Sequence, residues 1–308
     1  MVAVAVPMTY GVAAASMALE ALALRVARVR WSRREARTSL ASGGLAFGLM
    51  HLANLALYLA VLDRAWAHRV ADAGLSPAAW IGGFVLYDLS FYVGHRVGHE
   101  VRLFWCFHSV HHTAEEMRLT SAIRGSAFDF VYLPWFFVWI PLLGFHPAML
   151  LVIESASRTW GVLTHVSPAL LPSGGARVGR GWLGRLLVTP SAHRVHHGTA
   201  APYLDRNYGE VLLLWDHLLR THTPEGDAPT YGVLTPVDAG SLSAVQLSPW
   251  TSLWRDLRRA TRWRDRLRYL FDAPGWSHDG SDRRVRVARA SLLGAPRPPD
   301  DHAQGPAG

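Results

Sequence analysis

Half of the sixteen histidines in this chain fall into three short motifs with related spacing. The motifs are His95-Arg-Val-Gly-His99, His108-Ser-Val-His111-His112 and His193-Arg-Val-His196-His197. Positions three and four residues apart share one face of a helix, so each motif can direct two or three imidazoles toward one point. Together the motifs supply eight imidazoles, whereas a tetrahedral zinc ion takes at most four protein ligands. The spacing therefore predicts a site for two metal ions.

The identity of the metals follows from the ligand type and its surroundings. Imidazole suits zinc, copper, iron and nickel alike, but an all-nitrogen site for two metals beside a lipid bilayer favours a redox pair that handles O2. A zinc peptidase would carry the HExxH motif, whereas Arg96, Val97 and Gly98 separate the first histidine pair here, and Glu100 lies outside it. Two alternatives stay open: a membrane zinc-dependent hydrolase, and a metal-ion transporter, which would distribute its histidines through several helices.

A carboxylate in the apolar segment before the first motif is a candidate supporting residue. Asp88 lies one to two helical turns before His95, and a helix places residues 88, 92, 95 and 99 along one stripe. A buried carboxylate is costly unless it is paired, and a metal-bound imidazole usually donates its other N–H to a carboxylate or carbonyl. We therefore predict that Asp88 supports a ligand without binding metal itself.

Apolar stretches precede and separate the histidine motifs. Three of them, residues 2–24, 40–62 and 78–94, are long enough to approach or reach the span of a bilayer. The shorter pair 127–143 and 147–164 predicts a helical hairpin whose first arm is bent by prolines. We expect an all-α, integral-membrane domain of about four to five spanning or hairpin helices, with a cytoplasmic helical cap that holds the dimetal site.

The arginine cluster between Arg25 and Arg37 sets the expected orientation. The positive-inside rule places this cluster in the cytoplasm, and counting the apolar segments from there brings every histidine motif to the cytoplasmic face. Residues 254–271 place aromatic and leucine side chains at helical spacing among many arginines, which predicts an amphipathic helix on the cytoplasmic leaflet. All basic residues are arginine, as in many GC-rich bacteria, so the expected location is the bacterial inner membrane.

Composition narrows the possible partners. Half of the residues are hydrophobic and 13 are Trp, which is typical of a membrane protein. The net charge of +8 could serve nucleic acid or an anionic membrane surface. Because no zinc finger, RNP motif or basic zipper accompanies the arginines, no nucleic-acid partner is expected. Cys106 is the only cysteine, which excludes an intramolecular disulfide and a thiolate metal cluster.

The three motifs and their neighbours resemble a known family. The order HRxxHE, HxxHH and TPxxHRxHHG, followed by NYG and WD, is similar to that of the fatty acid hydroxylase/sterol desaturase superfamily, and closest in motif to its alkylglycerol monooxygenase-like branch. The resemblance spans roughly residues 80–276 and includes Pro274-Gly275-Trp276 near its end. One departure is Leu219-Arg220-Thr221, where many relatives carry a Phe-Gly-Thr-like turn.

This resemblance implies a membrane-bound, non-haem di-iron oxygenase that uses O2 as co-substrate to hydroxylate or desaturate a lipid substrate. It also implies a ninth ligand between the second and third motifs, for which His165 is the matching position. The expected metal ligands are His95, His99, His108, His111, His112, His165, His193, His196 and His197. Electrons would come from a separate donor: a ferredoxin, a cytochrome b5-like protein or a pterin. The expected organisation is variable N-terminal transmembrane segments over residues 1–77, a catalytic domain over 78–276 and a disordered tail over 277–308.

Overall fold

The computed structural model describes residues 2–54, 57–172, 182–281 and 283–292 of the chain. The regular elements of this part are all helical, which confirms the predicted all-α fold. The first helices are α1 (Val2–Val26), α2 (Arg33–Asn54), α3 (Leu57–Ala67), α4 (Pro77–Glu100) and α5 (Arg102–His112). They are followed by α6 (Leu119–Ala122), η1 (Asp129–Val131), η2 (Leu133–Phe136), α7 (Trp139–Leu142) and α8 (Pro147–Thr164). The last are α10 (Trp182–Leu186), α11 (Pro190–His196), α12 (Leu214–Leu218), α13 (Leu242–Arg259), α14 (Trp263–Phe271) and α15 (Val285–Leu292).

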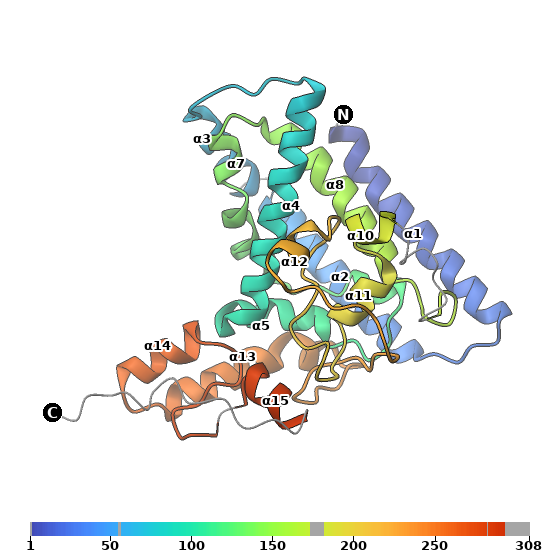
Figure 1. The fold of residues 1–308 in the computed structure, drawn as a ribbon, viewed down its shortest axis with the longest axis vertical. Helices are drawn as coiled ribbons and strands as arrows, with labels where there is room; N and C mark the ends of the chain where they lie inside the picture. Colours follow the sequence, from blue (N-terminus) through green and yellow to red (C-terminus); the bar gives the residue numbers. More distant parts are fainter. Residues whose placement is uncertain (1, 55–56, 173–181, 282, 293–308) are drawn as a thin grey trace.

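The long helices α1, α2, α4 and α8 form the main body, and α13, α14 and α15 gather at the end away from the N-terminus (Figure 1). α1 packs along α8, and α4 contacts both α5 and α8. One hydrophobic cluster joins α4 to α8 through Tyr87 and Leu150. A second joins α5 to α13 and α14 through Cys106, Leu253 and Tyr269. α5 therefore connects the main body to the C-terminal helices, and it carries the second histidine motif to that junction.

The described residues contain one helix that is long and apolar enough to cross a membrane, Pro7–Val26 within α1. The predicted span over residues 40–62 is divided between α2 and α3, and residues 55 and 56 lie outside the described part. The predicted arm over residues 127–143 is divided into η1, η2 and α7, because proline has a fixed φ and lacks the N–H that a continuous helix needs. Among the described residues, this criterion therefore supports one of the expected four to five spanning or hairpin helices.

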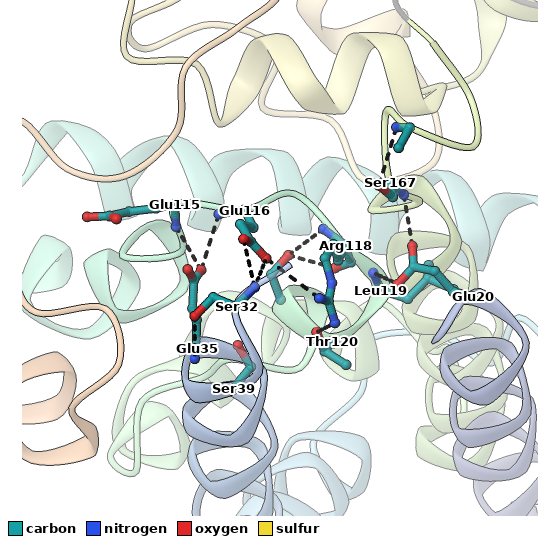
Figure 2. A network of polar contacts seen from close by, with 12 residues as sticks. Glu20, Ser32, Glu35, Ser39, Glu115, Glu116, Arg118, Leu119, Thr120 and Ser167 are labelled. Carbon is teal, nitrogen blue, oxygen red and sulfur yellow. Dashed lines mark hydrogen bonds and ion pairs between the residues drawn. The ribbon is translucent and has the colours of Figure 1, made fainter. Parts of the chain in front are cut away.

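Buried carboxylates tie α1 and α2 to the loops that follow two histidine-bearing helices (Figure 2). Glu20 of α1 accepts the backbone N–H groups of Leu119, at 2.9 Å, and Ser167, at 2.8 Å. Glu35 of α2 accepts the backbone N–H of Glu115 at 2.8 Å. The helices expected to form a variable N-terminal region thus support the loops after α5 and α8.

The predicted amphipathic helix over residues 254–271 consists of two helices. The helical structure is interrupted between Arg259 at the end of α13 and Trp263 at the start of α14. Tyr269 packs inward, whereas the side chains of Trp254 and Trp263 point outward and the two residues are 63% and 65% exposed. The amphipathic character that the sequence predicts is therefore present, but it is distributed over two helices.

The sequence predicts a disordered tail over residues 277–308, and the structure differs for part of it. Residues Val285–Leu292 form α15, and Arg289 donates a hydrogen bond to the carbonyl oxygen of Ala201 at 3.1 Å. This contact docks α15 onto the loop after the third histidine motif. Residues 293–308 lie outside the described part.

Candidate metal centre

The nine histidines predicted as metal ligands lie together where several helices end. His95 and His99 occupy the last turns of α4, and the second motif occupies the C-terminal half of α5. His165 is the C-cap residue of α8, and the third motif lies on α11, with His197 as its C-cap. The structure therefore brings His165 into the same cluster as the eight motif histidines.

Capping residues set the register of two of these helices. Ser76 begins α4, and its hydroxyl accepts the N–H of Ala79, with proline at the first helical position. Thr189 begins α11 in the same way, accepting the N–H of Ala192, and Pro190 follows it. A Ser or Thr N-cap satisfies a free helical N–H, and proline fits the first turn without losing a hydrogen bond. The register in turn decides the direction in which each helix presents its histidines.

The imidazole nitrogens form two adjacent groups. Within each group, one nitrogen from every member lies within 4.8 Å of the others. The five-histidine group contains His95, His99, His108, His112 and His196, and the four-histidine group contains His111, His165, His193 and His197. His112 and His197, which belong to different groups, stack with ring centroids 4.4 Å apart. Two such groups side by side match the predicted need for two metals.

The backbone orients many of these rings through their Nδ1 atoms. Four Nδ1 atoms face carbonyl oxygens at 2.7 to 3.2 Å: His95 faces Tyr208, His111 faces Arg124, His165 faces Gly161 and His196 faces Arg206. A carbonyl oxygen only accepts hydrogen bonds, so each of these neutral rings carries its proton on Nδ1. The Nε2 atom of each ring is then left with a lone pair.

The Nε2 atoms converge on one another. In the four-histidine group, Nε2 of His165 lies 3.3 Å from Nε2 of His111 and 3.0 Å from Nε2 of His193. The lone pairs of His111 and His165 face each other and repel at this distance, whereas a cation between them would attract both. In the five-histidine group, the Nε2 atoms of His95 and His99 are buried and have no hydrogen-bond partner among the described residues. Buried polar atoms normally have a partner, so this donor set fits bound metal ions.

Burial favours the metal-binding form of the rings. Desolvation lowers the pKa of His108, His112 and His193 well below its ordinary value, and neighbouring histidines lower it further. Burial also lowers the pKa of His111 to about 4. A metal binds the neutral imidazole, so at neutral pH these rings need lose no proton before they act as ligands.

Asp88 is buried on α4, but its hydrogen-bond partners are not histidines. Its carboxylate accepts the N–H groups of Val211 and Leu212, at 3.2 and 3.4 Å, and the indole N–H of Trp215 at 2.9 Å. The direct contact with an imidazole that the sequence suggests is replaced by these three donors. The physical reason is that His95, one to two turns further along the helix, is already bonded to a backbone carbonyl, while the 211–215 segment presents otherwise unpaired N–H groups to the carboxylate.

A second buried carboxylate, Asp216, holds the carbonyl group that faces His95. It accepts the N–H groups of Tyr208 and Gly209, each at 2.8 Å, and the hydroxyl of Thr221 at 2.7 Å. The carbonyl of Tyr208 in turn lies 2.7 Å from Nδ1 of His95. The NYG and WD elements, which the sequence presents only as family markers, thus bind each other and position the imidazole of His95.

Two further side chains support the histidines without any local motif. Asp205 lies 3.1 Å from Nδ1 of His99, as a carboxylate–imidazole pair. Its φ of 53° is left-handed, a conformation that Asp tolerates better than most residues. Arg124 is buried and donates to the hydroxyl of Thr113 at 3.0 Å, while its own carbonyl faces His111. Sequence spacing could not reveal these residues, because most of their partners are distant along the chain.

A largely apolar cavity of 420 Å³ adjoins the histidines. Phe47, Phe91 and Phe136 contribute to its wall, together with ligand candidates such as His95 and His165. A cavity of this size and lining suits an apolar small molecule or a lipid chain.

A second, more open pocket of 730 Å³ reaches His99 from the C-terminal helices. Arg268 and Phe271 of α14 and Asp205 also line it. Apart from α4, which contributes to both, different elements line the two pockets, so the site has an apolar approach and a more polar one.

The fold and the site define a class: an all-helical chain with two adjacent groups of buried imidazoles beside an apolar cavity. Residues 80–221 match the sequence profile of the family described as Fatty acid hydroxylase, and they contain all nine histidines. The predicted resemblance is confirmed: residues 80–221 are similar to the fatty acid hydroxylase family.

Curated relatives agree with the predicted branch. Alkylglycerol monooxygenase from Homo sapiens is 32% identical over 205 residues, which are 65% of this chain and 43% of the relative. The Danio rerio alkylglycerol monooxygenase is 28% identical over 261 residues, 84% of this chain and 55% of the relative. Ornithine lipid hydroxylase OlsE from Rhizobium tropici is 29% identical over 171 residues, 53% of this chain and 48% of the relative. The chain spans about half the length of these relatives, and no solved structure matches it.

Proposed function

We propose that this protein is a membrane-bound, non-haem di-iron oxygenase that uses O2 and external electrons to hydroxylate a C–H position of a lipid. One observation carries the proposal: nine imidazoles form two adjacent groups, each of a size that could hold a metal, beside an apolar cavity. The matched relatives, an alkylglycerol monooxygenase and an ornithine lipid hydroxylase, are by their names oxidoreductases that act on lipids. Gathering of the histidines in one place also favours an enzyme over a transporter.

The five-histidine group would hold one iron and the four-histidine group the other. Bound iron would supply the O2 chemistry that amino-acid side chains cannot perform. The chain's own contribution is to orient the rings, through carbonyl groups such as that of Tyr208 and through the carboxylate of Asp205. Burial of the site excludes bulk water from the reacting position.

The shape of the site supports a lipid substrate and a separate electron donor. Thr9, Tyr10 and Ala13 of α1 line the cavity, so the helix that could cross a membrane forms part of its wall. This contact supports substrate access from a bilayer. A ferredoxin, a cytochrome b5-like protein or a pterin would approach His99 through the open pocket beside α14. We place that side in the cytoplasm of a bacterial cell, with the main body in the inner membrane.

The test uses the full chain, expressed with iron and purified in detergent. We expect two irons per chain by elemental analysis. Lipids extracted from cells with and without the gene, grown under isotopically labelled O2, should differ by a product that contains labelled oxygen. His193→Ala should abolish this product, whereas His68→Ala, at an exposed histidine outside both groups, should not. A single bound zinc, or hydrolysed lipids without labelled oxygen, would contradict the proposal.

A further inference from the structure

Glu210 is a buried carboxylate in the wall of the apolar cavity. The residue is 8% exposed, and it lines the cavity together with His165 and His193. Its Oε2 atom is buried and receives no hydrogen bond from any described residue. An unpartnered carboxylate in such surroundings is costly, so its presence in the wall requires an explanation.

The other charged side chains that line this cavity are already satisfied within the described part of the chain. Glu154 and Arg158 form an ion pair at 2.8 Å. Asp129 accepts the N–H of Ser126 at 3.1 Å. Arg124 is bonded to hydroxyl groups, as described above. The positive charge of Arg158 also acts on Glu210, but the buried Oε2 atom of Glu210 still offers hydrogen-bonding capacity to a ligand.

The position of Glu210 is set by its neighbours. The N–H of Gly209 is held by Asp216, and the N–H of Val211 is held by Asp88, so the backbone on both sides is anchored. A methyl group added to Gly161 would lie only 3.2 Å from Oε1 of Glu210, so the carboxylate rests against the backbone of α8.

The contact with α8 places Glu210 close to a proposed metal ligand. The carbonyl of Gly161 accepts the Nδ1–H of His165 at 2.7 Å. The carboxylate thus lies about one helical turn from a histidine of the four-histidine group. A ligand group bound to Glu210 would therefore be held near the reacting end of the cavity.

We propose that Glu210 determines substrate specificity by binding a hydrogen-bond-donating group, a hydroxyl or an ammonium, on the lipid substrate. The proposal rests on the proposed lipid oxygenase function and narrows its substrate class to amphiphiles whose donor group enters the cavity. Burial raises the pKa of Glu210 to about 8, and a donor or a positive charge beside it would offset that cost. A free fatty acid is disfavoured once Glu210 is ionised, because its carboxylate would face the like charge of Glu210. The oxidised carbon should then lie near the polar end of the substrate.

The test compares four single-chain probes of matched chain length: hexadecylglycerol, hexadecylamine, palmitic acid and methyl palmitate. Their Kd values are measured under argon, without turnover, by competition with a fluorescent long-chain alcohol on the iron-loaded full chain. At a pH above 8, where Glu210 is ionised, we expect hexadecylglycerol or hexadecylamine to bind at least about tenfold more tightly than methyl palmitate, the lower range for a hydrogen bond to a charged group. The variants Glu210→Met and Glu210→Gln separate the two donors. If the preference for donor-bearing probes over methyl palmitate is lost in both variants, the group that Glu210 binds is an ammonium. If this preference is lost in Glu210→Met alone, the group is a hydroxyl.

The controls keep the inference distinct from the proposed function. Glu115→Gln, at an exposed carboxylate, should leave the preference unchanged. Gly161→Ala, which displaces the carboxylate without removing it, should weaken the preference if Glu210→Met fails to fold. Equal binding of all probes to the wild type, or a preference that survives Glu210→Met, would overturn the role of Glu210 even if the enzyme oxygenates lipids. A donor preference in a chain that forms no oxygenated product would instead overturn the proposed function alone.

Discussion

Replacing Asp205 by Asn is expected to weaken metal retention in the five-histidine group while leaving the fold intact. The carboxylate of Asp205 lies 3.1 Å from Nδ1 of His99, and its charge makes the ring a stronger ligand. Asn preserves the size of the side chain and can still accept the hydrogen bond, so the change isolates the charge. Asn also tolerates the left-handed backbone at this position, where φ is 53°.

The expected loss of metal affinity follows from the effect of a carboxylate behind a metal-bound histidine and from the solvent exposure of Asp205. Loss of a carboxylate behind a metal-bound histidine typically lowers metal affinity by about 10- to 100-fold. The side chain of Asp205 is 25% exposed, so water screens part of the interaction and we expect the lower end of that range. Roughly tenfold corresponds to about 1.4 kcal/mol in metal binding.

The assay is a chelator titration of the detergent-purified chain, followed by elemental analysis of the iron that remains. Asp205→Asn should lose its first iron at about tenfold lower chelator concentration than the wild type. Asp238→Asn, which removes an exposed ion pair with Arg34, is the matched control and should behave as the wild type does. A chelator midpoint for Asp205→Asn that equals the control value would refute the reasoning that this carboxylate strengthens a metal ligand.

Four further predictions follow from the same geometry. His165→Ala should leave the four-histidine group with three ligands and lower the retained iron from two to one per chain, and retention of both would exclude His165 as a ligand. Asp88→Asn should lower the free energy of unfolding by about 1–3 kcal/mol, because an amide N–H would face one of three N–H donors; an unchanged denaturant midpoint would contradict this. In the metal-free chain, the free energy of unfolding should be greatest above the unfolded-state histidine pKa near 6.5 and should fall as the pH drops toward 4. His111 alone should lower this free energy by about 1.4 kcal/mol at about pH 5.5, and a flat urea midpoint between these pH values would refute the prediction. Cysteines placed at the exposed positions Leu75 and Ser243, in a Cys106→Ser background, should be labelled from opposite sides of the membrane, and labelling from one side would overturn the topology.

The histidine site is the part of this protein that the sequence determines most directly. Helical spacing places His95 with His99, and His193 with His197, on one face over a single turn, so local chain geometry alone points each pair at a common centre. The number of imidazoles then predicts two metals. Pro134 and Pro141 likewise predict an interrupted helix, but they do not predict its division into η1, η2 and α7.

The tertiary structure decides which histidines act together and what supports them. His111 and His112 are adjacent in sequence, yet they belong to different groups, because successive helical residues point about 100° apart. Asp88 shares a helical stripe with His95 but bonds to a loop more than a hundred residues later. Asp205 and Glu20 have no local pattern at all, since their partners depend on how loops fold across the ends of helices. Local periodicity encodes the face on which a side chain lies, whereas its partner across the fold is set only when the whole chain has packed.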